Sequence, residues 1–198
     1  MDEDLEWAVS DDLIVHDTEM QLRDCNWKLL LEGGLEAYHF RVAHRKTIAR
    51  LFNDNLSSYV CHGPHIRSIL PRATLSELRE QAQSEWNIRE QANVLYTLFP
   101  NSSLLVQSDH VIWVKSEPLS VNQTEVRVVT LKPRNSEASK SYWDKNHGLT
   151  VMTLNEDFDL AESIQSGMAS GANDYLRFGR FEGALRRFND FVSDYLRE

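Results

Sequence analysis

Cysteine is scarce in this chain: Cys25 and Cys61 are the only two among 198 residues. Two thiols in a chain without a recognisable secretory signal favour a reducing compartment, so we expect free cysteines and a cytoplasmic protein. The scarcity also excludes an internal iron–sulfur cluster, which needs more ligands than these. The segment Cys61-His-Gly-Pro-His65 lacks a second cysteine and lies beside a predicted strand, so we interpret it as structural and not as a zinc site.

Long apolar runs and an excess of positive charge are also lacking. Without about 18 consecutive apolar residues, no membrane-spanning segment is expected. The chain carries 30 Asp and Glu against 21 Lys and Arg, a net charge of −9, and its start, Met1 to Trp7, is acidic, unlike a secretory signal. Because phosphate binding needs a basic surface, nucleic acid is not expected as a partner. An acidic surface mostly serves solubility, and it can also face a basic electron-transfer partner.

Apolar residues make up 41% of the chain and include five tryptophans, which is ample for one core. We therefore expect a single domain over residues 1–198. Short apolar runs between turn residues predict strands at 13–16, 57–70, 93–99, 103–107, 110–117 and 124–132. A Thr-x-x-Glu capping box predicts a helix over 74–83, and helical spacing predicts others from residue 35 and over 46–52, 136–148, 149–168 and 181–196.

Successive short strands joined by short turns favour an antiparallel meander. The predicted fold is α+β, with an antiparallel sheet that curls around a long C-terminal helix. A pocket between sheet and helix suits an apolar ligand. We expect it to be lined by strand residues, although alternation does not say which face of a strand points inward; the candidates are Val94, Tyr96, Leu98, Leu105 and Ile112.

The segment Glu36 to His44 carries the strongest functional signal. It places an acid three residues before His39 and a second histidine five residues further on. Two histidines and one carboxylate on one side of an ion form the facial triad of non-haem Fe(II) oxygenases. Chance produces this spacing roughly 0.04 times in a chain of this composition. The alternative is two unrelated histidines, one capping a helix and one satisfied in the core.

The spacing also predicts local geometry. Glu36 and His39 are three residues apart and share one helix face. His39 and His44 are five apart, about 140° around an ideal helix, so one straight helix cannot aim both at one ion. A metal site here requires the helix to end, bulge or kink between the two histidines.

A second carboxylate source is the helix predicted around residues 150–168, which contains Glu156, Asp157, Asp159 and Glu162. At 100° per residue, Asp157 projects into the apolar face, and the other three acids project away from it. That face comprises Leu154, Phe158, Ala161, Ile164 and Met168. An unpaired buried carboxylate costs several kcal/mol, so a buried Asp157 needs a partner, and a metal is one such partner. The alternatives are a Lys or Arg partner, or a position near the edge of the apolar face.

With these residues in view, the chain resembles a known family. The run from Asn26 to His44 resembles the mononuclear-iron motif of Rieske-type oxygenases, the ring-hydroxylating oxygenase alpha subunits. Asn155-Glu156-Asp157, with Gln165-Ser-Gly167 after it, resembles the third-ligand helix of that family. The resemblance implies Fe(II) bound by His39, His44 and Asp157. It also implies that Glu36 passes electrons from a Rieske [2Fe–2S] cluster, usually on a neighbouring subunit.

The resemblance further implies a helix-grip catalytic domain that activates O2 and hydroxylates or dealkylates a small aromatic or quaternary-amine-like substrate. Its partners would be a Rieske ferredoxin or reductase and, in a possible homotrimer, further copies of the chain. Two features depart from the family pattern. An N-terminal Rieske domain is absent, so oxygenase activity would need an external Rieske donor, and Gly33 stands where the family often has Asn. Glu36 occupies a position that is commonly Asp, with Glu in the branch acting on trimethylammonium substrates.

Side chains behind the metal ligands should orient both imidazoles, and Asn26, Glu36 and Tyr38 are the candidates. Two rival functions stay open. One is a non-catalytic module that binds hydrophobic ligands on the same scaffold, in which the histidines are incidental. The other is a regulatory subunit that keeps the iron site and docks to a complete oxygenase.

Overall fold

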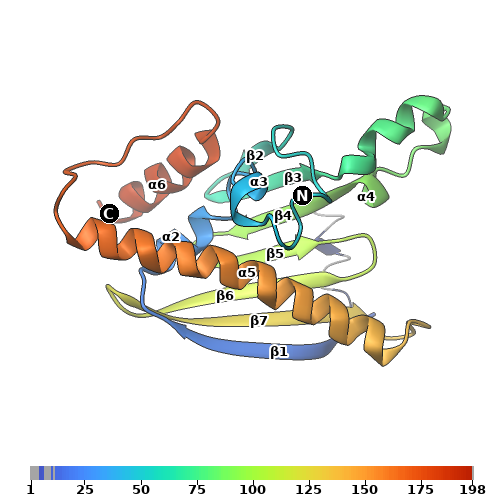
Figure 1. The fold of residues 1–198 in the computed structure, drawn as a ribbon, viewed down its shortest axis with the longest axis horizontal. Helices are drawn as coiled ribbons and strands as arrows, with labels where there is room; N and C mark the ends of the chain where they lie inside the picture. The colour runs from blue at the N-terminus through green and yellow to red at the C-terminus, as the bar shows by residue number, and fades with distance from the viewer. Residues whose placement is uncertain (1–4, 7–9, 11, 198) are drawn as a thin grey trace.

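A seven-stranded antiparallel sheet forms the centre of the part of the chain that the structure describes. The computed structural model describes residues 5–6, 10 and 12–197. Across the sheet the order is β1-β7-β6-β5-β4-β3-β2, so β2 to β7 form a meander and β1 pairs with β7 (Figure 1). The strands are β1 (Leu13–Arg23), β2 (Ser58–His62), β3 (His65–Pro71), β4 (Ala92–Leu98), β5 (Ser102–Val106), β6 (Val111–Ser120) and β7 (Gln123–Pro133).

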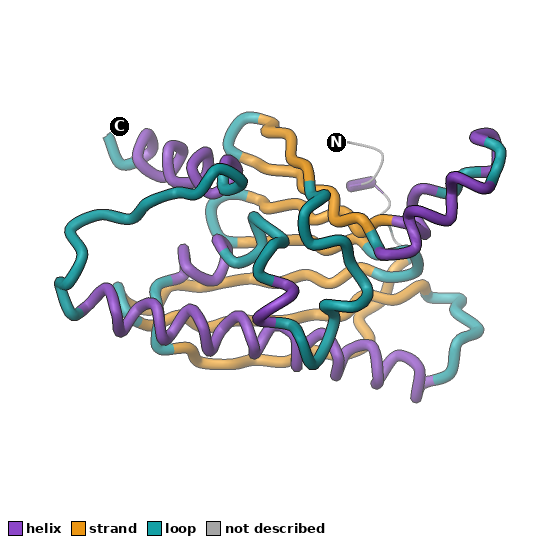
Figure 2. The backbone as a smooth tube through the Cα atoms, turned by 45° about the horizontal axis from the view of Figure 1, so that its top comes forward, coloured by secondary structure: helices purple, strands orange, loops and turns teal. Residues whose placement is uncertain are grey.

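Helices gather on one face of this sheet. Figure 1 shows α5 lying across it, with α2 and α3 on the same side and α6 near β2. The connection from α2 to β2, which contains α3, folds over the same face as α5 (Figure 2). The α-helices are α2 (Trp27–Glu32), α3 (Phe40–Ala43), α4 (Ile88–Gln91), α5 (Lys140–Ala169) and α6 (Gly183–Tyr195), and the 3-10 segments are η1 (Ala73–Glu80) and η2 (Gln83–Glu85).

The long helix α5 is fixed by a cap and by its apolar face. Ser139 is the N-cap, and its Oγ accepts a hydrogen bond of 3.2 Å from the backbone N–H of Tyr142. Near the middle of the helix, the buried Phe158 packs in one cluster with Ile112 of β6 and Val126 of β7. This contact sets the rotation of α5 about its axis and therefore the directions of the neighbouring residues 156 and 157.

The last helix, α6, packs on a different part of the molecule. Its buried residues Ala184 and Phe188 share a cluster with Leu31 and Leu35, on and just after α2, and with Ile66 of β3. The helix that crosses the sheet is therefore α5, and α6 supports the chain segment that leads from α2 toward residue 36.

The predicted α+β class and the antiparallel meander are confirmed, but several elements differ. Residues 57–70 form a hairpin rather than one strand, with Gly63 in its turn at a φ of 58°. The segment 74–83 is mainly 3-10, with no side-chain cap on η1. Residues 46–52 are turns rather than a helix, and 136–168 contains one helix that runs through Gly148.

The apolar face predicted for residues 149–168 is correct only in part. Phe158 and Ala161 are buried, whereas Ile164 is 50% exposed and Met168 is 43% exposed, so the last two turns of α5 extend past the sheet. No helix among the described residues is long and apolar enough to cross a membrane. Residues 1–4 and 7 of the acidic start lie outside the described residues.

Replacing Phe188 by Ala should lower the free energy of unfolding by about 3–5 kcal/mol, because it empties a fully buried aromatic site between α6, α2 and β3. Chemical denaturation of the two proteins measures this difference. Phe181 is 75% exposed, so Phe181→Ala is the matched control and should change stability by only about 0.5 kcal/mol or less. Equal effects of the two substitutions would show that α6 is not part of the core.

Candidate metal centre

His39 and His44 lie at the two ends of the single helical turn α3. His39 immediately precedes Phe40–Ala43, and His44 immediately follows it. The turn is closed by hydrogen bonds from Ala43 N to the His39 carbonyl at 2.8 Å and from His44 N to the Phe40 carbonyl at 3.1 Å. The helix predicted from residue 35 is thus reduced to this one turn, and Glu36 and His39 do not share a helix face. The helix does end before His44, as predicted, and both rings face the same point.

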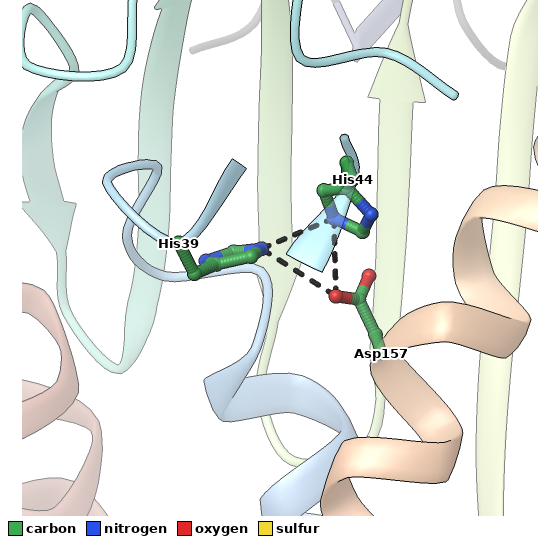
Figure 3. Close-up of side chains that lie close together, drawn as sticks. All are labelled: His39, His44 and Asp157. Atoms are coloured by element: carbon green, nitrogen blue, oxygen red, sulfur yellow. Dashed lines mark hydrogen bonds and ion pairs between the residues drawn. The ribbon is translucent and has the colours of Figure 1, made fainter. Parts of the chain in front are cut away.

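Asp157 reaches that point from the middle of α5. Its Oδ1 lies 3.4 Å from His39 Nε2 and 3.1 Å from His44 Nε2, and the two Nε2 atoms are 3.2 Å apart. Figure 3 shows the three side chains pointing toward one another from separate segments. One ligand-type atom from each residue lies within 4.8 Å of the others, and His44 is buried. The structure thus brings together the three residues that the sequence singled out.

Each imidazole is held from behind by a second carboxylate. Glu36 Oε1 contacts His39 Nδ1, and Glu36 Oε2 accepts a bond of 3.2 Å from the His39 backbone N–H. Glu156 Oε2 lies 2.9 Å from His44 Nδ1 and accepts a bond of 2.6 Å from the Thr47 hydroxyl. A carboxylate at Nδ1 favours a proton there and leaves the lone pair of Nε2 directed at the centre.

The pKa shifts follow from this crowding of acids around two rings. Burial opposes protonation of His39, but hydrogen bonds to Asp157 and Glu36 outweigh it and raise the pKa of His39 to about 9. For His44, burial is again outweighed by Asp157 and Glu156, so its pKa is also raised. Burial is outweighed at Asp157 too, and the imidazoles lower the pKa of its carboxyl group. The site therefore stabilises positive charge between the three side chains.

The three residues form part of the wall of a cavity of about 450 Å³. Its apolar lining includes Leu95 and Leu105 from the sheet, and Phe158 from α5. This volume lies within the range of small-molecule sites, roughly 300–1,000 Å³. Its polar lining includes Arg72, Asn93, Gln107, Asp109, His110 and Tyr142.

Two of the five residues predicted to line the pocket do so. Leu105 and Ile112 line the cavity. On β4, however, the lining residues are Asn93, Leu95 and Thr97, which alternate with the predicted ones. Val94, Tyr96 and Leu98 instead pack with Leu104, Val106 and Val111 in a separate cluster, because adjacent strand residues point to opposite faces.

Of the three residues predicted to orient the imidazoles, Glu36 alone contacts one. Asn26 caps α2 through Lys28 N and also bonds the Val121 carbonyl, and Tyr38 bonds Glu182. Sequence reasoning missed Glu156, which was predicted to point away from the site. Glu156 instead contacts Nδ1 of the His44 ring, whereas Asp157 faces Nε2 of the same ring. The clue in the sequence was that Glu156 is an acid directly adjacent to Asp157.

Two imidazoles and a carboxylate at the wall of a largely apolar cavity are typical of non-haem iron oxygenases. A family comparison agrees: residues 7–198 match the model of the ring hydroxylating alpha subunit (catalytic domain). The chain belongs to this family of Rieske-type oxygenase alpha subunits. No curated protein matches it.

Solved structures share the fold at low sequence identity. The chain is similar to the quaternary ammonium Rieske monooxygenase CntA in complex with L-carnitine, with a TM-score of 0.74, 20% identity and coverage of 98% of this chain and 52% of that one. For naphthalene 1,2-dioxygenase from Rhodococcus sp. bound to indole, the TM-score is 0.66 and the identity 14%, with coverage of 92% of this chain and 56% of that one. For dicamba monooxygenase bound to dicamba, the TM-score is 0.63 and the identity 10%, with coverage of 96% of this chain and 61% of that one. The chain thus spans little more than half the length of these proteins.

The contact between Glu156 and His44 predicts a measurable effect on metal affinity. Glu156→Gln should weaken binding of a divalent ion about 10–100-fold, because the amide oxygen can still accept from His44 Nδ1 but no longer supplies the negative charge that makes the imidazole a stronger ligand. Metal titration against a competing chelator measures the change. Asp159→Asn is the control, since this acid lies on the same helix but pairs with Arg23. Equal affinities in Glu156→Gln and wild type would remove Glu156 from the site.

Proposed function

We propose that this chain is the catalytic domain of a Rieske-type oxygenase, in which His39, His44 and Asp157 bind a mononuclear Fe(II). The reaction would be hydroxylation or dealkylation of a small aromatic or quaternary-amine-like substrate. The observation that carries the proposal is the convergence of His39 Nε2, His44 Nε2 and Asp157 Oδ1 within 4.8 Å. The family match and the structural neighbours support the same class of activity.

The donor set fits an iron ion on physical grounds. If both Nδ1 protons are engaged by Glu36 and Glu156, both Nε2 atoms and the Asp157 oxygen present lone pairs to one another. Three acceptors at such short range repel unless a proton or a cation lies between them. Two neutral imidazoles and one carboxylate are the ligands that non-haem Fe(II) takes while keeping coordination positions open for O2.

The surrounding residues would have distinct tasks. Glu36 and Glu156 orient the imidazoles, and Leu95, Leu105 and Phe158 exclude water from the cavity wall. The long helix α5, which lies across the sheet as in a helix-grip domain, supplies Asp157. A dry cavity strengthens the electrostatic interactions of the site and limits side reactions.

We propose a role for Glu36 in electron delivery. It lines the inner cavity beside His39 and also lines a second hollow, of about 390 Å³, with Tyr38, Tyr59 and Arg180. Glu36 is therefore a residue shared by the walls of the two hollows. We propose that a Rieske cluster on a ferredoxin-like partner or on a neighbouring copy, as in a homotrimer, approaches from the second hollow. A cytoplasmic location with a reductase partner completes the proposal.

Removing Asp157 should abolish iron binding while the fold persists. Asp157→Ala deletes one of three ligands, and His39→Ala deletes another, so neither variant should retain iron after anaerobic reconstitution. Iron content is measured alongside circular dichroism, which checks the fold. If the wild type takes up no iron, or if these variants retain as much as wild type, the chain is better described as a hydrophobic-ligand-binding module.

Glu36→Gln separates iron binding from electron delivery. The amide oxygen can still accept from His39 Nδ1, so at saturating iron the site should stay loaded, with a reduced affinity like that expected for Glu156→Gln. Turnover with a supplied Rieske donor should fall sharply, because the charged bridge between the two hollows is lost. Steady-state turnover and iron content are measured on the same sample, and normal turnover in this variant would exclude Glu36 from the electron path.

A further inference from the structure

The polar wall of the cavity is a continuous chain of hydrogen bonds. Arg72 donates from Nε and Nη2 to Asn93 Oδ1 at 3.2 and 2.9 Å. Asn93 Nδ2 donates to Gln107 Oε1 at 3.4 Å, and Gln107 Nε2 lies 2.9 Å from His110 Nε2. Asn93 and His110 are each only 2% exposed. Because two of its members, Asn93 and His110, are buried, this chain fixes the orientation of the Arg72 guanidinium at one end.

At the other end of the chain, the acid Asp109 already has partners. Its Oδ1 lies 2.7 Å from His110 Nδ1, and its Oδ2 accepts a bond of 2.6 Å from the Tyr142 hydroxyl. These bonds lower the pKa of Asp109, so the carboxylate stays ionised and engaged within the chain. A ligand cation at Asp109 would have to compete with both donors.

Unlike Asp109, Arg72 has hydrogen-bonding groups without a partner among the described residues. Its two bonds go to a neutral amide, which leaves three of the five guanidinium N–H groups for other acceptors. Among the residues that the structure describes, no carboxylate lies within ion-pair distance of Arg72. A second guanidinium, that of the exposed Arg50, also lines the cavity and likewise has no acidic partner in the described part of the chain.

The backbone of Arg72 is fixed as well. Its N–H donates to the Gln91 carbonyl at 2.8 Å, and its own carbonyl accepts a bond of 2.7 Å from Asn53 Nδ2. A guanidinium held at both main chain and side chain loses little conformational entropy when it binds a planar anion.

We propose that Arg72 is the anchor for a carboxylate on the substrate, so that the cavity selects organic acids with an apolar body. The carboxylate would bind the free N–H groups of Arg72, and the apolar body would lie along Leu95, Leu105 and Ile112 toward His39, His44 and Asp157. This inference rests on the proposed function and names the class of substrate for that same site.

Calorimetric titration of the metal-free chain tests the proposal, because without iron a carboxylate has no metal to coordinate. The probes share one body: 3-phenylpropanoate, 3-phenylpropanamide and trimethyl(3-phenylpropyl)ammonium. Wild type should bind the carboxylate about tenfold or more tightly than the amide, as expected for charge-assisted bidentate hydrogen bonds. Equal affinities, a preference for the ammonium probe or no carboxylate binding would overturn the proposal.

Variants assign the preference to one residue. Arg72→Gln should abolish the preference for the carboxylate and leave amide affinity unchanged, and Arg72→Lys should retain part of it, which also decides the matter if Arg72→Gln does not fold. Arg79→Gln is the matched control, an exposed arginine of the neighbouring η1 that does not line the cavity. An unchanged preference in the Arg72 variants would overturn the assignment.

Iron uptake by the wild type is measured separately. If the chain prefers the carboxylate but takes up no iron, the anion site is supported and the proposed oxygenase function is contradicted. If the chain takes up iron but binds the three probes equally, the proposed function is supported and the carboxylate anchor is contradicted.

Discussion

Three lone-pair acceptors are forced together at the centre of this molecule, and the rest of the structure holds them there. His39 Nε2, His44 Nε2 and Asp157 Oδ1 lie 3.1–3.4 Å apart. Glu36 and Glu156 hold the far nitrogen of each ring, which directs the near nitrogens inward. Such a cluster is stable only if positive charge lies at its middle. Protons on the two imidazoles, whose pKa values are raised, supply it in the absence of a metal, and a divalent cation satisfies all three groups at once.

The geometry of α5 follows from this constraint. Three consecutive residues have three tasks: Glu156 contacts the back of the His44 ring, Asp157 faces the centre, and Phe158 packs against the sheet. An α-helix separates successive side chains by about 100°, so it can supply three directions from three adjacent positions, which an extended strand cannot. The burial of Phe158 is therefore what fixes the aim of both acids.

The sequence was most informative where chemistry restricts residue type and least informative where tertiary packing decides. Metal ligation admits few side chains, so spacing and burial arguments singled out His39, His44 and Asp157, which the structure brings together, and the five-residue interval predicted that the helix ends before His44. Glu156 was missed because its partner depends on where His44 lies above α5. The inward face of β4 was assigned wrongly because both faces are buried, as Asn93 and Tyr96 show, so alternation of polarity carries no signal there.

Charge also determines which way round a ligand would lie in the cavity. Glu36, Glu156 and Asp157 surround the imidazoles, so with a bound divalent ion and neutral rings the metal end keeps a formal charge of about −1. The polar wall carries two guanidinium groups, Arg72 and Arg50, and one acid, Asp109, so its formal charge is about +1. A ligand carboxylate would be repelled from the first end and attracted to the second. The same field would turn the uncharged part of an organic acid toward His39, His44 and Asp157, which is the orientation that oxidation of a carbon remote from the carboxylate requires.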